Sequence, residues 1–212
     1  MNVGILGSGE VGLRLAEGFV ATGHTVKVGS RSPDKISQWA TRNEGKVSTG
    51  SFSDAASFGD IVVLATLWEG TPSAIEMAGK KNFSGKVVVD VTNPLDFSNG
   101  VPPRLALGHS DSGGETVQRL IPDALVVKAF NIVGNAHMFK PDFPGGPPTM
   151  FLCGNDPSAK KIVTEILDSF GWESIDIGGI EGARLLEQLA MLWIVCYFKK
   201  GSGNHAFKLL QK

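Results

Sequence analysis

Three glycines near the start of the chain have the spacing that favours binding of a dinucleotide. Gly7, Gly9 and Gly12 follow the apolar run at 2–6, and a helical pattern of apolar residues follows them. Gly7 permits a tight turn, Gly9 leaves room for a pyrophosphate to approach the backbone, and Gly12 lets a helix pack closely on the strand. Free N–H groups at the helix N-terminus complete such a site. A second strand-like run at 25–28 supplies the strand–turn–helix–strand order that the motif requires.

The residues after the second predicted strand indicate which dinucleotide binds. An NAD site usually places a carboxylate about 20 residues beyond the glycines, where it holds the ribose 2′-OH. This chain has Ser30 and Arg31 there, with Lys35 one turn further on, and the first carboxylate after the second predicted strand is Asp34. A hydroxyl, a guanidinium and an ammonium group suit a 2′-phosphate, which carries more than one negative charge. The pattern therefore favours NADP(H) over NAD(H).

Composition narrows the function class. The chain has 212 residues, of which 42% are hydrophobic and 19% are charged, as in a compact folded protein. Its net charge of −1 gives no general attraction to nucleic acid or to an anionic membrane. The longest apolar stretch, 189–198, is too short to span a bilayer. Two separated cysteines and scattered histidines give no metal-ligand spacing, so we expect no metal site and a cytoplasmic location.

Strand-like and helix-like patterns alternate along the chain. This alternation predicts an α/β protein with a Rossmann-type, doubly wound and mostly parallel sheet. Apolar runs predict strands at residues 2–6, 25–28, 46–48, 60–65, 86–90, 125–129, 149–153 and 173–177. Helical patterns predict helices at residues 13–20, 33–42, 55–58, 72–78, 116–120 and 157–170, and a long final helix from about residue 180. Ser32-Pro33 and Ser53-Asp54 are the expected starts of the second and third helices, and the second would point its N-terminus at the 2′-phosphate.

A Pro/Gly-rich stretch divides the chain. Residues 141–148 read PDFPGGPP and are the best candidate for a hinge between two parts. We expect a nucleotide-binding Rossmann domain at 1–140 and a small C-terminal α/β domain at 149–212. A second long loop, 91–108, is rich in Pro, Asn and Gly, and loops of this length are often functional.

Residues that directly follow the predicted strands are the remaining site candidates, because ligands bind at the carboxyl ends of strands in such a sheet. Small, amide and apolar residues there suit a carboxamide and a ribose; these candidates are Thr66, Leu67, Trp68, Asn93, Asn131 and Gly134. These loops contain no carboxylate pair and no Ser/His/Asp or Cys/His set, so no catalytic residue is assigned. An alcohol or imine substrate would need a proton donor, for which His109, His137 and Lys128 are the candidates.

Several stretches together resemble a known family. They are GILGSGEVG, VGSRSPDK, TLWEG, DVTNPL, VVKAFNIVGN and ARLLEQLAMLWI, and they extend from Gly4 to Ile194. The chain resembles the F420-dependent NADP reductases, which pass hydride between NADP and a deazaflavin. It is also similar to the cytoplasmic reductase module of membrane metalloreductases.

The resemblance implies roles by position. It places Ser8, Gly9, Glu10 and Val11 at the pyrophosphate, and it makes the C-terminal domain the part that closes the acceptor cleft. Adding the glycines, the 2′-phosphate group and the strand-end residues gives the predicted cofactor site: Gly7, Ser8, Gly9, Glu10, Val11, Gly12, Ser30, Arg31, Lys35, Thr66, Leu67, Trp68, Asn93, Asn131 and Gly134. The hydride acceptor stays open among F420, FMN, FAD and other small molecules.

Hydride transfer between a nicotinamide and a flavin-like ring needs close stacking rather than a protein acid, which agrees with the residues found. Two alternatives stay open: an NADPH-dependent imine or 3-hydroxy acid reductase, and a non-enzymatic NADP(H)-sensing protein. Imine and hydroxy acid reductases usually carry a larger helical second domain, and about sixty residues follow the predicted hinge here. The apolar final helix is suited to core packing or to pairing two copies into a homodimer.

Overall fold

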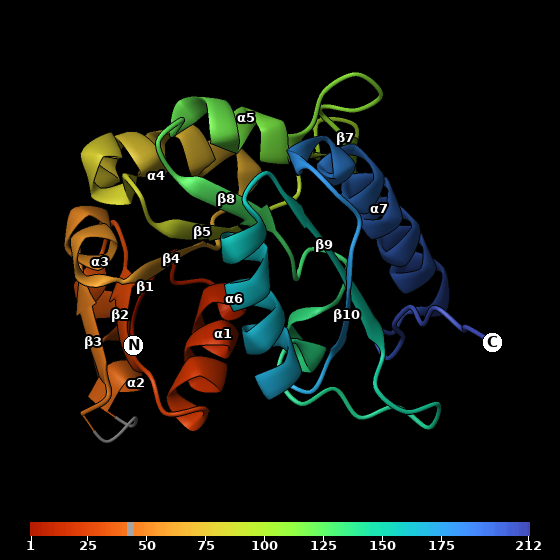
Figure 1. Cartoon of the computed structure of the whole chain (residues 1–212), viewed down its shortest axis with the longest axis horizontal. Coiled ribbons are helices and arrows are strands. Elements are labelled where there is room, and N and C mark those ends of the chain that lie inside the picture. The colour runs from red at the N-terminus through yellow and green to blue at the C-terminus, as the bar shows by residue number, and fades with distance from the viewer. Residues whose placement is uncertain (42–44) are drawn as a thin grey trace.

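A mostly parallel β-sheet forms the centre of the protein (Figure 1). The computed structural model describes residues 1–41 and 45–212, and within them the sheet has eight strands in the order β10-β9-β8-β5-β4-β1-β2-β3. The strands are β1 (Asn2–Leu6), β2 (Thr25–Gly29), β3 (Val47–Gly50), β4 (Ile61–Leu64), β5 (Val87–Asp90), β8 (Leu125–Lys128), β9 (Thr149–Gly154) and β10 (Glu173–Asp176). The order from β3 to β8 is that of a Rossmann dinucleotide-binding fold, which confirms the predicted fold class.

Helices cover both faces of the sheet (Figure 1). The helices are α1 (Glu10–Ala21), α2 (Ser37–Thr41), α3 (Phe52–Phe58), α4 (Thr71–Ala78), α5 (Gly113–Leu120), α6 (Pro157–Ser169) and α7 (Ala183–Lys200). Helices α1, α2 and α6 bury apolar residues in one core, whereas α3, α4 and α5 bury theirs in a second core. The central strands β4 and β5 are buried at every position, which explains their continuous apolar sequences.

The sheet continues across the predicted hinge. Strand β9 pairs antiparallel with β8, where Val127 lies opposite Gly154, and β10 then pairs parallel with β9. Met150 and Leu152 of β9 pack in the same core as residues of β1 and α1. The chain before 141 and the chain after 148 therefore share one sheet and one core, and the functional division into two domains stays a prediction.

Two helices begin at residues other than those predicted. Helix α3 begins at Phe52 with Ser51 as its N-cap, not Ser53. The Ser51 hydroxyl accepts from the Asp54 N–H at 3.1 Å and the Asp54 carboxylate accepts from the Ser51 N–H at 2.8 Å, which is a capping box. Helix α5 begins at Gly113 rather than at residue 116, with Ser112 as its N-cap.

The segment at 33–42 is less regular than predicted, and the loop at 91–108 is more regular than predicted. The predicted helix at 33–42 is the 3₁₀ turn η1 (Pro33–Ile36) followed by α2, and Arg42 lies outside the described residues. Ser32 is at the N-cap of η1, but its side chain makes no capping hydrogen bond within the described part of the chain. The loop at 91–108 contains a short antiparallel pair, β6 (Leu95–Asp96) and β7 (Arg104–Leu105). Further 3₁₀ turns are η2 (Trp68–Gly70), η3 (Lys80–Phe83), η4 (Asn135–His137) and η5 (Ile180–Gly182).

In residues 1–41 and 45–212, no helix combines the length and the apolar character that crossing a bilayer requires. The same residues contain no group of three or more His, Cys, Asp or Glu side chains arranged to hold a metal ion.

Candidate functional site

The carboxyl ends of β1, β2, β4, β5 and β8 lie on one edge of the sheet, because these strands are mutually parallel. The loops that leave this edge carry the residues singled out in the sequence. Two pairs of them are in direct contact, Ser8 with Ser30 and Asn93 with Asn131. Glu10 contacts Asn135, which the sequence did not single out. The edge is therefore the candidate site.

The glycine-rich turn has the geometry that its sequence predicts. Gly7 has a φ of +126°, and a Cβ there would lie 2.2 Å from the Ala65 carbonyl oxygen. A Cβ on Gly12 would lie 2.1 Å from the Gly7 carbonyl oxygen, so α1 packs directly on the turn. At Gly9, by contrast, a Cβ would meet no described atom within 4 Å. The backbone at Gly9 is thus open to a ligand, next to the first N–H groups of α1.

Ser30 lies at the centre of a small polar group after β2. Its hydroxyl oxygen accepts hydrogen bonds from the Ser8 hydroxyl at 3.0 Å and from the Ser32 N–H at 3.1 Å. Both acceptor positions of this oxygen are therefore used, and the Ser30 proton points elsewhere. Arg31 and Lys35 are exposed beside it. The arrangement presents one oriented hydroxyl donor and two exposed cationic side chains to the solvent.

The loop after β4 presents an apolar side chain to the open edge. Thr71, at the start of α4, donates to the Leu67 carbonyl oxygen at 3.1 Å and shares a 2.7 Å hydrogen bond with the Thr66 hydroxyl. These bonds fix the loop while the Leu67 side chain is 85% exposed. Trp68 is half-buried and packs toward Gly113, where a Cβ would lie 3.1 Å from the indole ring. Leu67 and Trp68 thus face different surroundings, although they are neighbours in sequence.

Two asparagines join the loops after β5 and β8. The Asn93 side-chain amide donates to the Asn131 carbonyl oxygen at 2.8 Å, and the Asn131 side chain donates to the Asn93 Oδ1 at 3.0 Å and to the Leu186 carbonyl at 3.1 Å. The Asn131 Oδ1 is buried and has no hydrogen-bond partner among the described residues. Phe130, one residue earlier, is buried with a φ of +62°. Such a backbone conformation is costly for an aromatic residue, so the surrounding contacts must hold it.

Helix α7 closes this part of the edge. A Cβ on Gly134 would lie 2.9 Å from the Trp193 ring, so the indole rests directly on the loop after β8. The indole also stacks on His205, with ring centroids 4.6 Å apart, and its Nε1 donates to the His205 carbonyl at 2.8 Å. His137, in the neighbouring turn η4, contacts Asn204 at 3.2 Å. The chain after α7 therefore borders the candidate site.

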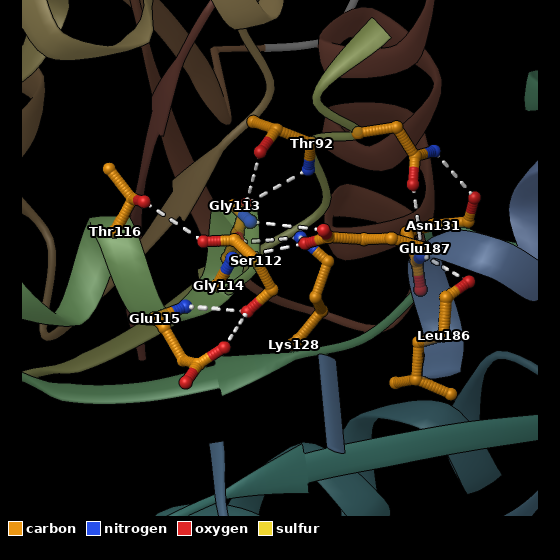
Figure 2. Close-up of polar contacts among 12 residues, drawn as sticks. Thr92, Ser112, Gly113, Gly114, Glu115, Thr116, Lys128, Asn131, Leu186 and Glu187 are labelled. Atoms are coloured by element: carbon orange, nitrogen blue, oxygen red, sulfur yellow. Dashed lines mark hydrogen bonds and ion pairs between the residues drawn. The ribbon is translucent and has the colours of Figure 1, made fainter. Parts of the chain in front are cut away.

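A buried ion cluster of Asp90, Lys128 and Glu187 lies beneath the site (Figure 2). Lys128 Nζ is 2.8 Å from Asp90 Oδ2 and 2.9 Å from Glu187 Oε1, and all three side chains are at most 1% exposed. Burial alone would lower the pKa of Lys128, but the two carboxylates outweigh it, so the pKa is raised above its ordinary value. Lys128 is therefore a charged, enclosed structural group and not an accessible proton donor.

The cluster has two carboxylates and one ammonium group, and its carboxylates accept further hydrogen bonds from backbone N–H groups and from one hydroxyl. The Glu187 carboxylate accepts from the Gly113 and Gly114 N–H groups, both at 3.0 Å, at the N-terminus of α5. The second Asp90 oxygen accepts from the Thr92 N–H at 2.9 Å and from its hydroxyl at 2.7 Å (Figure 2). The hydrogen bonds satisfy both carboxylates, as a buried charge requires, and they connect β5, α5 and α7.

The sequence reasoning missed this cluster, although part of its signal was present. Asp90 and Lys128 each end an apolar strand, and they are register partners in adjacent strands. Opposite charges at matched ends of two buried strands predict an ion pair. Glu187 gives no comparable signal, since it is one acidic residue within a long helix, and its partners lie 59 to 74 residues away in the sequence.

The strand order and the glycine-rich turn define the class of protein: a Rossmann-type nucleotide-binding protein. A sequence model of the family described as "NADP oxidoreductase coenzyme F420-dependent" matches residues 2–94. The chain is 32% identical to the F420-dependent NADP reductase of Methanocaldococcus jannaschii over 218 residues, which covers 96% of each chain. The protein therefore belongs to the F420-dependent NADP reductase family of oxidoreductases.

Solved structures and other relatives agree with this assignment. The crystal structure of a putative F420-dependent NADP reductase from Arthrobacter sp. FB24 superposes with a TM-score of 0.93 at 35% identity, covering 100% of both chains. Rat metalloreductase STEAP3 is 30% identical over 189 residues, which is 89% of this chain but 36% of that protein. An imine reductase from Bacillus cereus shares the fold alone, with a TM-score of 0.68 at 20% identity over 94% of this chain and 63% of that one.

Proposed function

We propose that this protein transfers hydride between NADPH and a flavin or deazaflavin acceptor, with F420 as the first candidate. The family supports the reaction class, since its described members are F420-dependent NADP reductases. The observation within the chain that carries the proposal is the oriented Ser30 hydroxyl beside Arg31, at the position where an NAD site would place a carboxylate.

The proposed binding mode follows the open carboxyl edge. The 2′-phosphate would be held by Ser30, Arg31 and Lys35, and the pyrophosphate would lie over the open backbone at Gly9 and the N-terminus of α1. The nicotinamide half would then reach the loops that carry Leu67, Thr66, Asn93, Asn131 and Gly134. Bound NADPH supplies the hydride, and the residues supply binding, orientation and exclusion of water.

The surroundings of the titratable groups support an acceptor that needs no protein acid. Lys128 is enclosed by its two carboxylates and is 0% exposed. His109 is exposed in a loop, and His137 is bound to Asn204. A flavin or deazaflavin ring accepts hydride and takes up the resulting charge itself, whereas an imine or a ketone needs a placed proton donor. This difference favours the first acceptor class over an imine or 3-hydroxy acid.

We propose that the part of the chain after residue 148 covers the bound acceptor. It supplies Trp193, which rests on Gly134, and the segment with His205 that packs on the indole.

We also propose a cytoplasmic homodimer that pairs through α7, because Leu185, Leu192 and Phe198 on this helix are 68%, 53% and 41% exposed. Sedimentation of the wild type and of a Leu185→Glu/Leu192→Glu variant tests the pairing, which predicts a dimer for the former and a monomer for the latter.

An acceptor screen tests the proposed reaction. Purified protein is mixed with NADPH and then with F420, FMN, FAD, riboflavin and a cyclic imine in turn, and loss of the nicotinamide absorbance is followed. We expect turnover with F420 or a flavin. Turnover with the imine alone would support the alternative reductase, and tight NADPH binding without turnover of any acceptor would support a sensing role.

A further inference from the structure

We propose that the Glu10 carboxylate favours the oxidised form of the bound nucleotide, and so makes bound NADPH a better hydride donor. The inference rests on the proposed function. Glu10 is the first residue of α1, so its backbone belongs to the turn where the pyrophosphate would lie. Its Oε2 accepts a hydrogen bond from the Asn135 side-chain amide at 2.9 Å. The side chain thus extends from the phosphate turn to the loop after β8.

The contact fixes the position of this carboxylate. The Asn135 Oδ1 accepts from the Ala136 N–H at 2.9 Å, which directs the Asn135 NH₂ group toward Glu10. Arg14, one turn further along α1, donates to the carbonyl oxygens of Ala136 and Phe139, both at 3.3 Å. The loop after β8 is therefore bonded to α1 at Asn135 and at two residues beyond it. Glu10 is exposed, and its hydrogen bond to Asn135 directs the carboxylate toward the loop after β8.

The charge of Glu10 is not neutralised in place. Its hydrogen-bond partner is a neutral amide, and within residues 1–41 and 45–212 it forms no ion pair. The nearest cation along the helix, Arg14, is directed to Glu17 at 3.3 Å and to the two carbonyls. A full negative charge therefore stands where the dinucleotide must cross from the α1 turn toward the strand ends.

The two redox states of the nucleotide respond differently to this charge. The phosphates are the same in NADPH and NADP⁺, so their repulsion by Glu10 weakens both states alike. The oxidised nicotinamide ring carries one positive charge and the reduced ring carries none. In the proposed binding mode the nicotinamide half lies at the loop that carries Gly134, and Glu10 is hydrogen-bonded to the next residue, Asn135. A carboxylate at this position in a partly hydrated site would attract the oxidised ring and change the binding ratio by about three- to tenfold.

The test compares the affinities of both nucleotides in a Glu10→Gln variant. Glutamine keeps a side-chain oxygen that accepts from Asn135 and removes the charge. Calorimetric titration should show tighter NADPH binding and a Kd ratio, NADP⁺ over NADPH, that rises about three- to tenfold. A tenfold change corresponds to a potential of the bound couple that is about 30 mV more positive. Glu165→Gln, on the exposed surface of α6, makes the same change in net charge and should leave the ratio unaltered.

A second variant separates charge from contact. Glu10→Ser removes both the carboxylate and the hydrogen bond to Asn135, and the inference predicts the same rise in the ratio. An unchanged ratio in Glu10→Gln, or a rise in Glu10→Ser alone, would overturn it while wild-type binding of both nucleotides left the proposed function standing. A wild type that binds neither nucleotide would instead remove the proposed function itself.

Discussion

Single side chains after β2 are expected to set the choice between NADPH and NADH. The Ser30 oxygen is already occupied by two donors, so its proton is the group available to a phosphate, and Arg31 stands exposed beside it. A nucleotide that carries a 2′-hydroxyl in place of the 2′-phosphate offers these two residues no charged partner. Their contribution should therefore appear in the affinity for NADPH and not in that for NADH.

The double substitution Ser30→Ala/Arg31→Ala should weaken NADPH binding by about 3 kcal/mol, or roughly 100-fold, because charge-assisted hydrogen bonds to phosphate are lost. NADH affinity should hardly change. Titration with each nucleotide measures both effects, with Arg119→Ala/Ser158→Ala on the exposed surfaces of α5 and α6 as a control of the same composition change. An equal loss for both nucleotides would contradict the phosphate-binding role.

At the scale of elements, α5 and α7 contact each other through polar groups in the buried interior and also in a partly buried position nearer the surface. Beyond the buried Glu187, the Arg184 guanidinium of α7 makes two hydrogen bonds to the Glu115 carboxylate of α5. Arg184 in the first place, and the Ser112 hydroxyl in the second, lower the pKa of Glu115 against the opposing effect of burial. Folding therefore favours the ionised carboxylate.

A lowered pKa gives stability that is present above the unfolded value, about 4.3, and is lost as the pH falls below it. Glu115→Gln should reduce the urea midpoint at pH 7 by roughly 0.3 M. The difference from the wild type should shrink at an acidic pH below the lowered pKa of Glu115, where the wild-type carboxylate is protonated. Glu165→Gln should show no such dependence. A difference of the same size at both pH values would contradict this assignment of Glu115.

The elements themselves were largely predictable, because apolar runs and helical periodicity reflect burial directly. The residues at which the helices begin were less predictable. Ser51 and Ser53 both lie at the start of α3, and it is the spacing from Ser51 to Asp54 that forms the capping box. Glycine disfavours helix, so Gly113 and Gly114 were expected to precede α5. They are helical in the structure, where the distant Glu187 carboxylate binds their N–H groups.

The same reasoning explains what could be predicted of the site. Residues at strand ends were found because parallel strands align their carboxyl ends. The contact of Glu10 with Asn135 was not predicted, because the local sequence does not specify how far the loop after β8 folds back on α1. The position of Trp193 over Gly134 likewise depends on the packing of α7, which neither the residue types nor their spacing specifies.

At the scale of the whole molecule, the chain after α7 holds separate parts of the fold together. The Phe207 carbonyl accepts from the Thr149 N–H at 2.9 Å, and the Leu209 N–H donates to the Thr149 hydroxyl at 3.1 Å. Phe207 also packs against the core, and His205 stacks on Trp193. Residues 201–212 thereby connect the end of α7 to the start of β9.

Removal of residues 203–212 should lower the free energy of unfolding by about 3 kcal/mol, through the lost burial of Phe207 and the lost hydrogen bonds. Tryptophan emission should shift to longer wavelength, because the Trp193 indole becomes more exposed. Urea unfolding and fluorescence measure the two effects. Removal of the exposed Gln211 and Lys212 alone is the control and should change neither. Identical midpoints for the shorter and full chains would show that the segment contributes no stability.

The salt-bridged centre of Asp90, Lys128 and Glu187 also limits how the molecule can move. If α7 drew back from the sheet, a lysine or a carboxylate would remain bare in an apolar interior, at a cost of several kcal/mol. Because the same glutamate holds the first turn of α5, the two helices should travel as one rigid block with the ends of β5 and β8. A bulky acceptor could then enter only if peripheral loops, such as the exposed Leu67 segment, change conformation. The distance between the strand ends and α7 would stay constant throughout turnover.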